Sequence, residues 1–201
     1  MEILDHESYS GICLNEDNFS DRALTGCRFI HCTFRNTIME GLKTIRCIFS
    51  ECDFTSARMN SSSHEGSAFT NCQFHYANLF CATFFECKML GSSFLEANLP
   101  GIEIVRGDWS YTNIRNHNLK GLDLREVNFV YADLSQSNLE KADLRDADLC
   151  HAVLVKANLA GVNLRGARTE GLDFRGFNLR GVLLDITQAV SVAQGLGAIV
   201  E

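Results

Sequence analysis

A repeat of five residues runs through most of this chain. If the large apolar residue of each repeat is called its centre, every fifth position from Leu14 to Leu184 gives 35 centres, of which 32 are Leu, Phe, Met, Ile or Trp. The exceptions are Thr44, His64 and Thr169. Two residues before the centre, 26 of the 35 repeats carry Ala, Cys, Ser, Thr, Val or Gly. A period of five fits neither a helix nor a flat strand. It predicts a solenoid in which each repeat forms one side of a coil.

A second period of 20 residues sets the number of sides. Nine of the 11 Phe centres fall into two columns whose members are separated by multiples of 20. An asparagine column stands one residue before the centre, at Asn78, Asn98, Asn118, Asn138, Asn158 and Asn178. Four repeats per coil explain both columns, so the cross-section is expected to be square. With neighbouring coils about 4.8 Å apart, the 35 repeats predict a rod roughly 42 Å long.

Composition and charge exclude several classes of protein. The chain has 201 residues, 46% of them apolar and 21% charged, which is typical of a folded soluble protein. A net charge of −7 argues against direct binding of nucleic acid, because such binding neutralises phosphates with Lys and Arg. We find no signal peptide and no apolar run long enough to span a membrane, so a cytoplasmic protein is expected. The unbroken register predicts one repeat domain over 1–184 and a tail over 185–201.

The nine cysteines invite a metal-site interpretation that the register argues against. Cys27, Cys32, Cys47 and Cys52 have a zinc-like spacing. However, six cysteines occupy the inward position two residues before a centre: Cys27, Cys32, Cys47, Cys52, Cys72 and Cys87. A free thiol packs as a small apolar group, so we expect core residues, no metal and a reducing compartment. Cys13, Cys81 and Cys150 lie off that column.

No arrangement of residues suggests catalysis. His64 at a centre and His117 at an inward position are expected to be buried with a polar partner, and the other histidines are scattered. There is no phosphate-binding glycine loop and no H-E-x-x-H sequence. A filled solenoid also offers no substrate cavity, so we expect neither an enzyme nor a cofactor. Pro100-Gly101 and the segment 61–64 are the expected places for kinks.

Acidic residues gather one position before the centres, on the outside of the coil. The candidate partner-binding acids are Glu103, Asp108, Asp123, Asp133, Asp143 and Asp148. Glu103, Asp123 and Asp143 form one column of adjacent like charges, which is mildly destabilising. Such a set is either a solvated face or a surface whose summed field imitates a nucleic acid. A separate outward apolar set, Phe80, Phe85, Leu90, Leu95 and Val105, is expected to be covered by local distortion.

The period changes after Leu184. Asp185 and Gln188 predict a helix that begins with a capping box, and Gly195 fits the position just after its end. So short a helix must pack on something. It could simply cap the open end of the solenoid, but its apolar residues exceed what a cap needs. We therefore expect a symmetric homodimer through Leu183, Ile186, Val190, Leu196, Ile199 and Val200.

The repeated A(D/N)Lxx sequence resembles the pentapeptide-repeat family over about 170 of the 201 residues. The resemblance implies a right-handed quadrilateral β-helix. The tail, with Asp185, Gln188-Ala189 and Leu196-Gly197, resembles those of topoisomerase-protecting members, the quinolone-resistance, mycobacterial gyrase-inhibitor and albicidin-resistance types. The segments 66–69 and 87–92 look most like the mycobacterial type.

In that subgroup, two rods join end to end and the acidic dimer resembles B-DNA. The resemblance therefore implies a DNA mimic that binds the DNA-binding saddle of the DNA gyrase A subunit and protects the enzyme from a poison. Excess protein would inhibit gyrase. A generic pentapeptide scaffold for other protein partners is the alternative.

Overall fold

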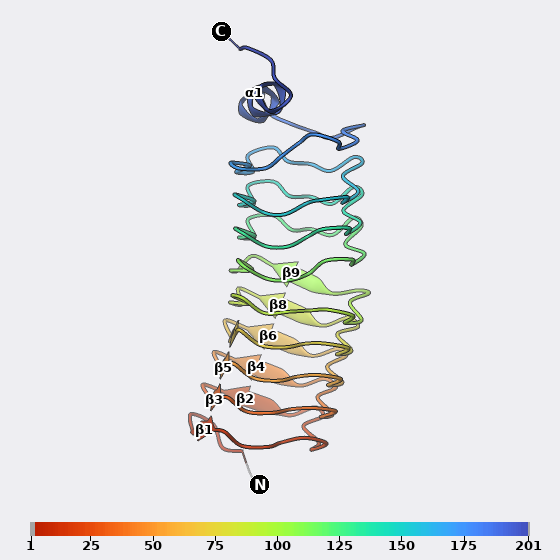
Figure 1. The fold of residues 1–201 in the computed structure, drawn as a ribbon. Coiled ribbons are helices and arrows are strands. Elements are labelled where there is room, and N and C mark those ends of the chain that lie inside the picture. Colours follow the sequence, from red (N-terminus) through yellow and green to blue (C-terminus); the bar gives the residue numbers. More distant parts are fainter. Residues whose placement is uncertain (1–2, 201) are drawn as a thin grey trace.

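The computed structural model describes residues 3–200, and these form a four-sided β-solenoid. Each coil takes 20 residues, so that Phe29 pairs with Phe49 and Phe49 with Phe69 in parallel register. The coils stack into a rod with the N-terminus at one end and the only helix of the described residues at the other (Figure 1). The expected right-handed quadrilateral β-helix with a short C-terminal helix is confirmed.

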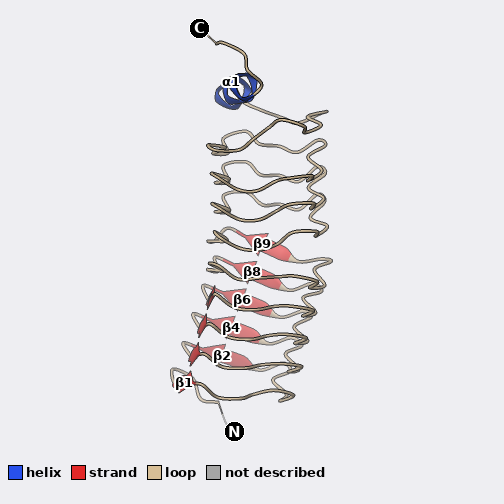
Figure 2. Ribbon diagram, in the orientation of Figure 1, coloured by secondary structure: helices blue, strands red, loops and turns tan. Residues whose placement is uncertain are grey.

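Within residues 3–200, nine three-residue strands form two parallel sheets on adjacent sides of the rod, from its N-terminal end to just past its middle (Figure 2). One sheet has the order β1-β3-β5-β7 and the other the order β2-β4-β6-β8-β9. The strands are β1 Ser8–Ser10, β2 Ala23–Thr25, β3 Arg28–Ile30, β4 Lys43–Ile45, β5 Ile48–Ser50, β6 Ser63–Glu65, β7 Ala68–Thr70, β8 Thr83–Phe85 and β9 Glu103–Val105. The remaining sides are joined by single-residue bridges, also 20 residues apart.

The solenoid begins before the first predicted centre, Leu14. Tyr9 lies in β1 opposite Phe29, and the two rings stack with centroids 5.2 Å apart. The amide of His6 already donates to the carbonyl oxygen of Thr25. Tyr9 holds the correct register position, but tyrosine is not one of the large apolar residue types that define the repeat.

The strands lie only on sides whose residue before the centre is neither Asp nor Asn. Where it is Asp or Asn, its Oδ1 typically accepts a hydrogen bond from the amide two residues later, as Asp133 does from Ser135 at 2.9 Å. This Asx turn bends the chain directly after the centre. None of the nine strands carries Asp or Asn at that position, which holds Ser8, Ala23, Arg28, Lys43, Ile48, Ser63, Ala68, Thr83 and Glu103. The strands therefore end where the A(D/N)L repeat becomes regular.

Phenylalanine rings fill the core of the N-terminal half. Phe49 is fully enclosed and lies parallel to Phe29 at 5.0 Å and to Phe69 at 4.7 Å. A second column, Phe34, Phe54, Phe74 and Phe94, stacks in the same way, with centroids 4.8–5.0 Å apart. Rings of the two columns meet edge to face, as Phe34 and Phe49 do at 5.9 Å. Seven of the nine Phe residues in the two sequence columns thus form two continuous stacks, whereas Phe129 and Phe174 lie further along the rod.

The inward cysteines are buried core residues, as expected, and they also donate hydrogen bonds. The thiol of Cys72 points to the carbonyl oxygen of Phe49, a centre of the preceding coil, at 3.4 Å. Ser92 bonds Phe69 in the same way at 2.7 Å. All six thiols follow this pattern, so a small donor at the inward position satisfies a carbonyl inside the coil.

Both predicted core histidines have polar partners. The ring of His64 lies between the hydroxyls of Thr44, 2.7 Å from Nδ1, and Ser62, 3.0 Å from Nε2. Full burial lowers the pKa of His64 to about 3, so the ring is uncharged at neutral pH. His117 Nε2 is 2.8 Å from the carbonyl oxygen of Phe94, and burial also lowers its pKa.

The ladder of inter-coil hydrogen bonds opens at two places. The asparagine column shows both openings. Asn98 donates to Asn78 at 2.7 Å, and Asn158 donates to Asn138 at 3.0 Å. Within residues 3–200, no side-chain bond joins Asn98 to Asn118, and none joins Asn158 to Asn178. The mid-rod opening separates 96–106 from 116–126, beside the expected kink at Pro100-Gly101. The C-terminal opening separates 152–159 from 172–178.

The tail forms helix α1, Ile186–Gly195, with the predicted capping box. Asp185 accepts from the amide of Gln188, and the Gln188 side chain accepts from the amide of Asp185, both at 3.1 Å. The predicted C-terminal end is wrong by two residues. Gly195 is the last helical residue, whereas Gly197, at φ +93°, takes the left-handed conformation that glycine permits.

Candidate partner-binding site

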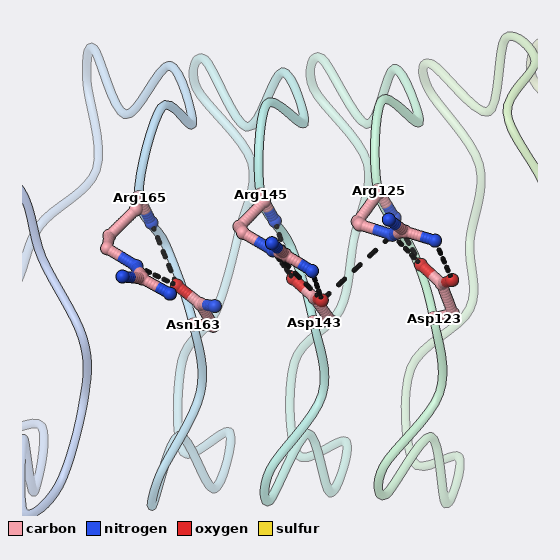
Figure 3. Close-up of polar contacts among 6 residues, drawn as sticks. All are labelled: Asp123, Arg125, Asp143, Arg145, Asn163 and Arg165. Atoms are coloured by element: carbon pink, nitrogen blue, oxygen red, sulfur yellow. Dashed lines mark hydrogen bonds and ion pairs between the residues drawn. The ribbon is translucent and has the colours of Figure 1, made fainter.

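The acidic column that contains Asp123 and Asp143 is paired with arginines. Asp123 binds Arg125 of the same repeat at 2.6 Å, and Asp143 binds Arg145 at 2.7 Å (Figure 3). Arg125 also reaches 4.0 Å from Asp143 in the next coil. The predicted column is present, with Asp123 and Asp143 in register one coil apart, but its charges are not all of one sign. It is a ladder of alternating sign, because each aspartate is followed two residues later by an arginine on the same face.

The arginines also set the protonation of these carboxyl groups. The hydrogen bond from Arg125 holds the pKa of Asp123 below its usual value, and Arg145 does the same for Asp143. Arg165, one coil further, binds the neutral Asn163 at 3.0 Å, so its charge is not balanced within the ladder (Figure 3). This face carries both signs of charge rather than a negative stripe.

The other candidate acids divide into two kinds. Asp148 pairs with Arg168 of the next coil at 2.6 Å. Among the described residues, no cation lies within ion-pair distance of Glu103, Asp108 or Asp133. Asp108 accepts hydrogen bonds from Ser110 and Asn128. We define Asp123, Asp143 and Asp148 as the paired acids and Glu103, Asp108 and Asp133 as the unpaired acids.

Apolar and aromatic groups also reach the surface. Phe80, Phe85 and Val105 are 48%, 40% and 38% exposed, so the expectation that this apolar set is covered is wrong for them. An aromatic column that was not predicted lies at a corner of the rod, where Tyr131 stacks on Tyr111 at 5.0 Å and on His151 at 4.9 Å. The 20-residue spacing of these three residues in the sequence is the signal that predicts this stack.

The tail presents most of its apolar residues to solvent. Ile186 and Ile199 are 86% and 89% exposed, Leu183, Leu196 and Val200 are exposed too, and Val190 is half-buried. The helix packs on the rod through two residues that the seam prediction left out. Val192 is buried, and Gln188 Nε2 donates to the carbonyl oxygen of Ala167 at 2.8 Å. One face of α1 is thus docked and the other is free.

Residues 3–200 contain no group of three or more His, Cys, Asp or Glu side chains placed to hold a metal ion. The single described helix is too short and too polar to cross a membrane.

A stack of five-residue sides with inward small and large residues defines a pentapeptide-repeat solenoid. The family model for pentapeptide repeats matches this chain in eight copies, over residues 47–84, 110–140 and 142–181. The chain therefore belongs to the pentapeptide-repeat family, whose members compared here are interaction proteins without enzymatic activity.

Individual relatives extend this comparison. The pentapeptide repeat protein MfpA of Mycobacterium tuberculosis is 41% identical over 73 residues, which cover 36% of this chain and 40% of MfpA. The matched segment thus spans less than half of that relative. A trypsin-treated form of QnrB1, described as a plasmid-mediated fluoroquinolone resistance protein, superposes with a TM-score of 0.87 at 22% identity, covering 98% of this chain and 99% of that one. Full-length QnrB1 superposes with a TM-score of 0.69 at 21% identity, covering 95% of this chain and 100% of that one.

Proposed function

We propose that this protein is a DNA mimic that binds DNA gyrase and protects it from a topoisomerase poison. The observation that carries the proposal is the combination of an acidic rod with a fold that matches a fluoroquinolone resistance protein along 98% of the chain. The local sequence similarity to MfpA supports the same proposal. The partner site is the DNA-binding saddle of the gyrase A subunit, and the protein acts in the cytoplasm.

The shape requirement is met by a homodimer joined through the tails. Two rods of roughly 42 Å placed end to end give about 85 Å, which matches roughly 25 base pairs of DNA at 3.4 Å each. The exposed face of α1, with Ile186 at its start, is the seam between the two copies. A symmetric dimer would place this patch against its own copy.

The charge requirement falls mainly on the unpaired acids. An aspartate bound to an arginine two residues away contributes little net field at a distance, because the two charges nearly cancel. Glu103, Asp108 and Asp133 have no such partner and leave a negative potential for a basic saddle to meet. We therefore assign the gyrase contact to the faces that carry them, with the paired acids in a secondary role.

The test is a gyrase supercoiling and cleavage assay with a fluoroquinolone, with and without the protein. Protection is expected at moderate concentration, inhibition of supercoiling in excess, and weaker association as salt rises. Protein that leaves both activities unchanged at all concentrations would refute the gyrase proposal and favour a scaffold for other partners.

Two triple variants locate the contact. Glu103→Gln with Asp108→Asn and Asp133→Asn, and Asp123→Asn with Asp143→Asn and Asp148→Asn, each remove three negative charges per subunit. The first variant is expected to weaken gyrase binding at least tenfold at physiological salt, and the second by clearly less. Equal losses would mean that only the summed charge matters, and an unaffected first variant would place the contact elsewhere.

The dimer has its own matched pair of variants. Ile186→Glu changes an exposed seam residue and is expected to give folded monomers in analytical ultracentrifugation. Gln194→Glu adds the same charge at an exposed position of the same helix outside the proposed seam and is expected to remain dimeric. A chain truncated after Leu184 is also expected to be monomeric. Ile186→Glu that sediments like the parent would refute this seam.

A further inference from the structure

The C-terminal opening is a slot lined by unused backbone hydrogen-bonding groups. Within the described residues, five amides that the register pairs with the neighbouring coil donate to no backbone oxygen: Leu154, Lys156, Leu159, Asp173 and Asn178. One coil earlier, all five equivalent bonds are present at 2.8–2.9 Å, including Leu134 to Val153 and Gln136 to Val155. The slot therefore exposes donors and acceptors on both of its walls.

Bulky inward residues explain why the coils separate there. Leu172 and Phe177 occupy inward positions that hold Ala152 and Ala157 one coil earlier. Phe177 is only half-buried and contacts the ring of Phe174 edge to face, with centroids 6.4 Å apart. The coil interior at this level leaves too little space for side chains of this size. The last coil consequently diverges from the stack beneath it (Figure 1).

The space between the two walls suits an extended apolar segment. The cavity has a volume of about 670 Å³ and includes Val153 and Val155, which are 42% and 59% exposed. Its arginine, Arg175, is already held by Asp173 at 2.8 Å. An extended chain in this slot would bond the free backbone groups and cover the valines, in the manner of strand addition to a sheet edge.

The tail of a second copy has the required chemistry. The segment 196–200, Leu-Gly-Ala-Ile-Val, carries no charge and has no regular structure, and its Leu196, Ile199 and Val200 are exposed. It leads away from its own rod beyond α1 (Figure 1). The proposed seam places the other copy on that side. Four residues in extended form reach about 13 Å, enough to pass one or two coils.

We propose that the tails are exchanged in the dimer, so that residues 197–200 of each copy enter the C-terminal opening of the other as an added strand. This rests on the proposed tail-to-tail dimer, which it deepens: the last coil is complete only when the second copy supplies the missing strand. The exchanged strands hold the two rods end to end along one axis.

Hydrogen exchange and sedimentation test this together. The slot amides of Leu154, Lys156 and Leu159 are expected to exchange at least tenfold more slowly in the parent dimer than in a chain truncated after Gly197. That chain keeps α1 and the seam residues up to Leu196 and loses only Ile199 and Val200 of the seam. A parent that sediments as a dimer but shows no such difference overturns tail exchange and leaves the dimer standing. A parent that sediments as a monomer overturns both, and slow slot amides in that monomer would mean that the tail enters its own slot.

Disulfide trapping supplies an independent readout. In a Cys13→Ser, Cys81→Ser background, Val155→Cys combined with Ile199→Cys is expected to give a covalent dimer on oxidation. The control is Thr55→Cys with Ile199→Cys, because Thr55 occupies the same column five coils away. Equal cross-linking in both proteins, or none in either at a concentration where the dimer forms, would contradict the exchange.

Discussion

The side-chain amide of Gln188 donates a 2.8 Å hydrogen bond to the carbonyl oxygen of Ala167 and so fixes helix α1 to the last coils. Gln188 is buried, and its Oε1 also accepts from the amide of Asp185 in the capping box. A single residue thus starts the helix and docks it. The orientation of the free apolar face of α1 depends on this contact.

Replacing Gln188 by Ala is expected to release the helix. The variant loses the reciprocal half of the cap and leaves a buried carbonyl oxygen without a donor, at a cost of about 1–3 kcal/mol. Limited proteolysis should cut the tail much faster while the thermal unfolding of the rod changes little. Gln194→Ala is the control, since Gln194 lies on the exposed face. Unchanged tail cleavage in Gln188→Ala would show that Val192 alone holds the helix.

Acid is expected to destabilise the rod through His64. Its pKa is about 3 in the folded chain and about 6.5 when unfolded, so between these values the unfolded chain binds the extra proton. The stability contribution is present above pH 6.5 and is lost as the pH falls, by about 1.4 kcal/mol per pH unit well inside the window. Urea unfolding at pH 7, 6 and 5 measures this slope.

His64→Phe separates this effect from other titrations. The centre usually holds an apolar residue, Thr44 keeps its 3.0 Å bond to Ser67, and Ser62 keeps its 2.7 Å bond to Met59. The variant is therefore expected to fold and to show a shallower slope, with the remainder due partly to His117. An identical slope would assign the acid sensitivity to other groups.

The nine thiols are expected to react in two classes with a disulfide reagent. Burial raises the pKa of Cys47 to about 11 and that of Cys87 to about 12, so these thiols stay protonated and inaccessible. Cys13 is exposed, and a hydrogen bond from the amide of Asn15 lowers its pKa. Native protein should react rapidly at Cys13 and Cys81 only, with the rest reacting in denaturant. A chelator should change neither class.

The Phe stack is expected to dominate the stability of the N-terminal half. Phe49→Ala opens a cavity between Phe29 and Phe69 and should cost about 3–5 kcal/mol of unfolding free energy. Phe85→Ala removes the same side chain from a partly exposed position and should cost far less. Comparable losses for the two variants in urea unfolding would mean that the stack relaxes around the deletion.

The sequence determined the repeat unit, the four sides and the stacked columns, because a five-residue register can bury its large residues only by stacking equal coils. It also contained local signals that were not used. Tyr9 continues the register, and the spacing Asp-Leu-Arg at 123–125 and 143–145 places each arginine beside its aspartate on one face. These follow from neighbours along the chain, where spacing alone fixes the distance.

Only the tertiary structure decided where the stack opens. Leu122, Leu172 and Phe177 are each too large for an inward position, but large inward Leu42 is accepted without loss of the ladder. The difference lies in how much space the coils above and below leave, a quantity that depends on residues 20 positions away in both directions. The same holds for His64, whose partner Thr44 lies one coil earlier and itself bonds Ser67 of the adjoining side. Packing volume and hydrogen-bond partners across coils are properties of the assembled rod.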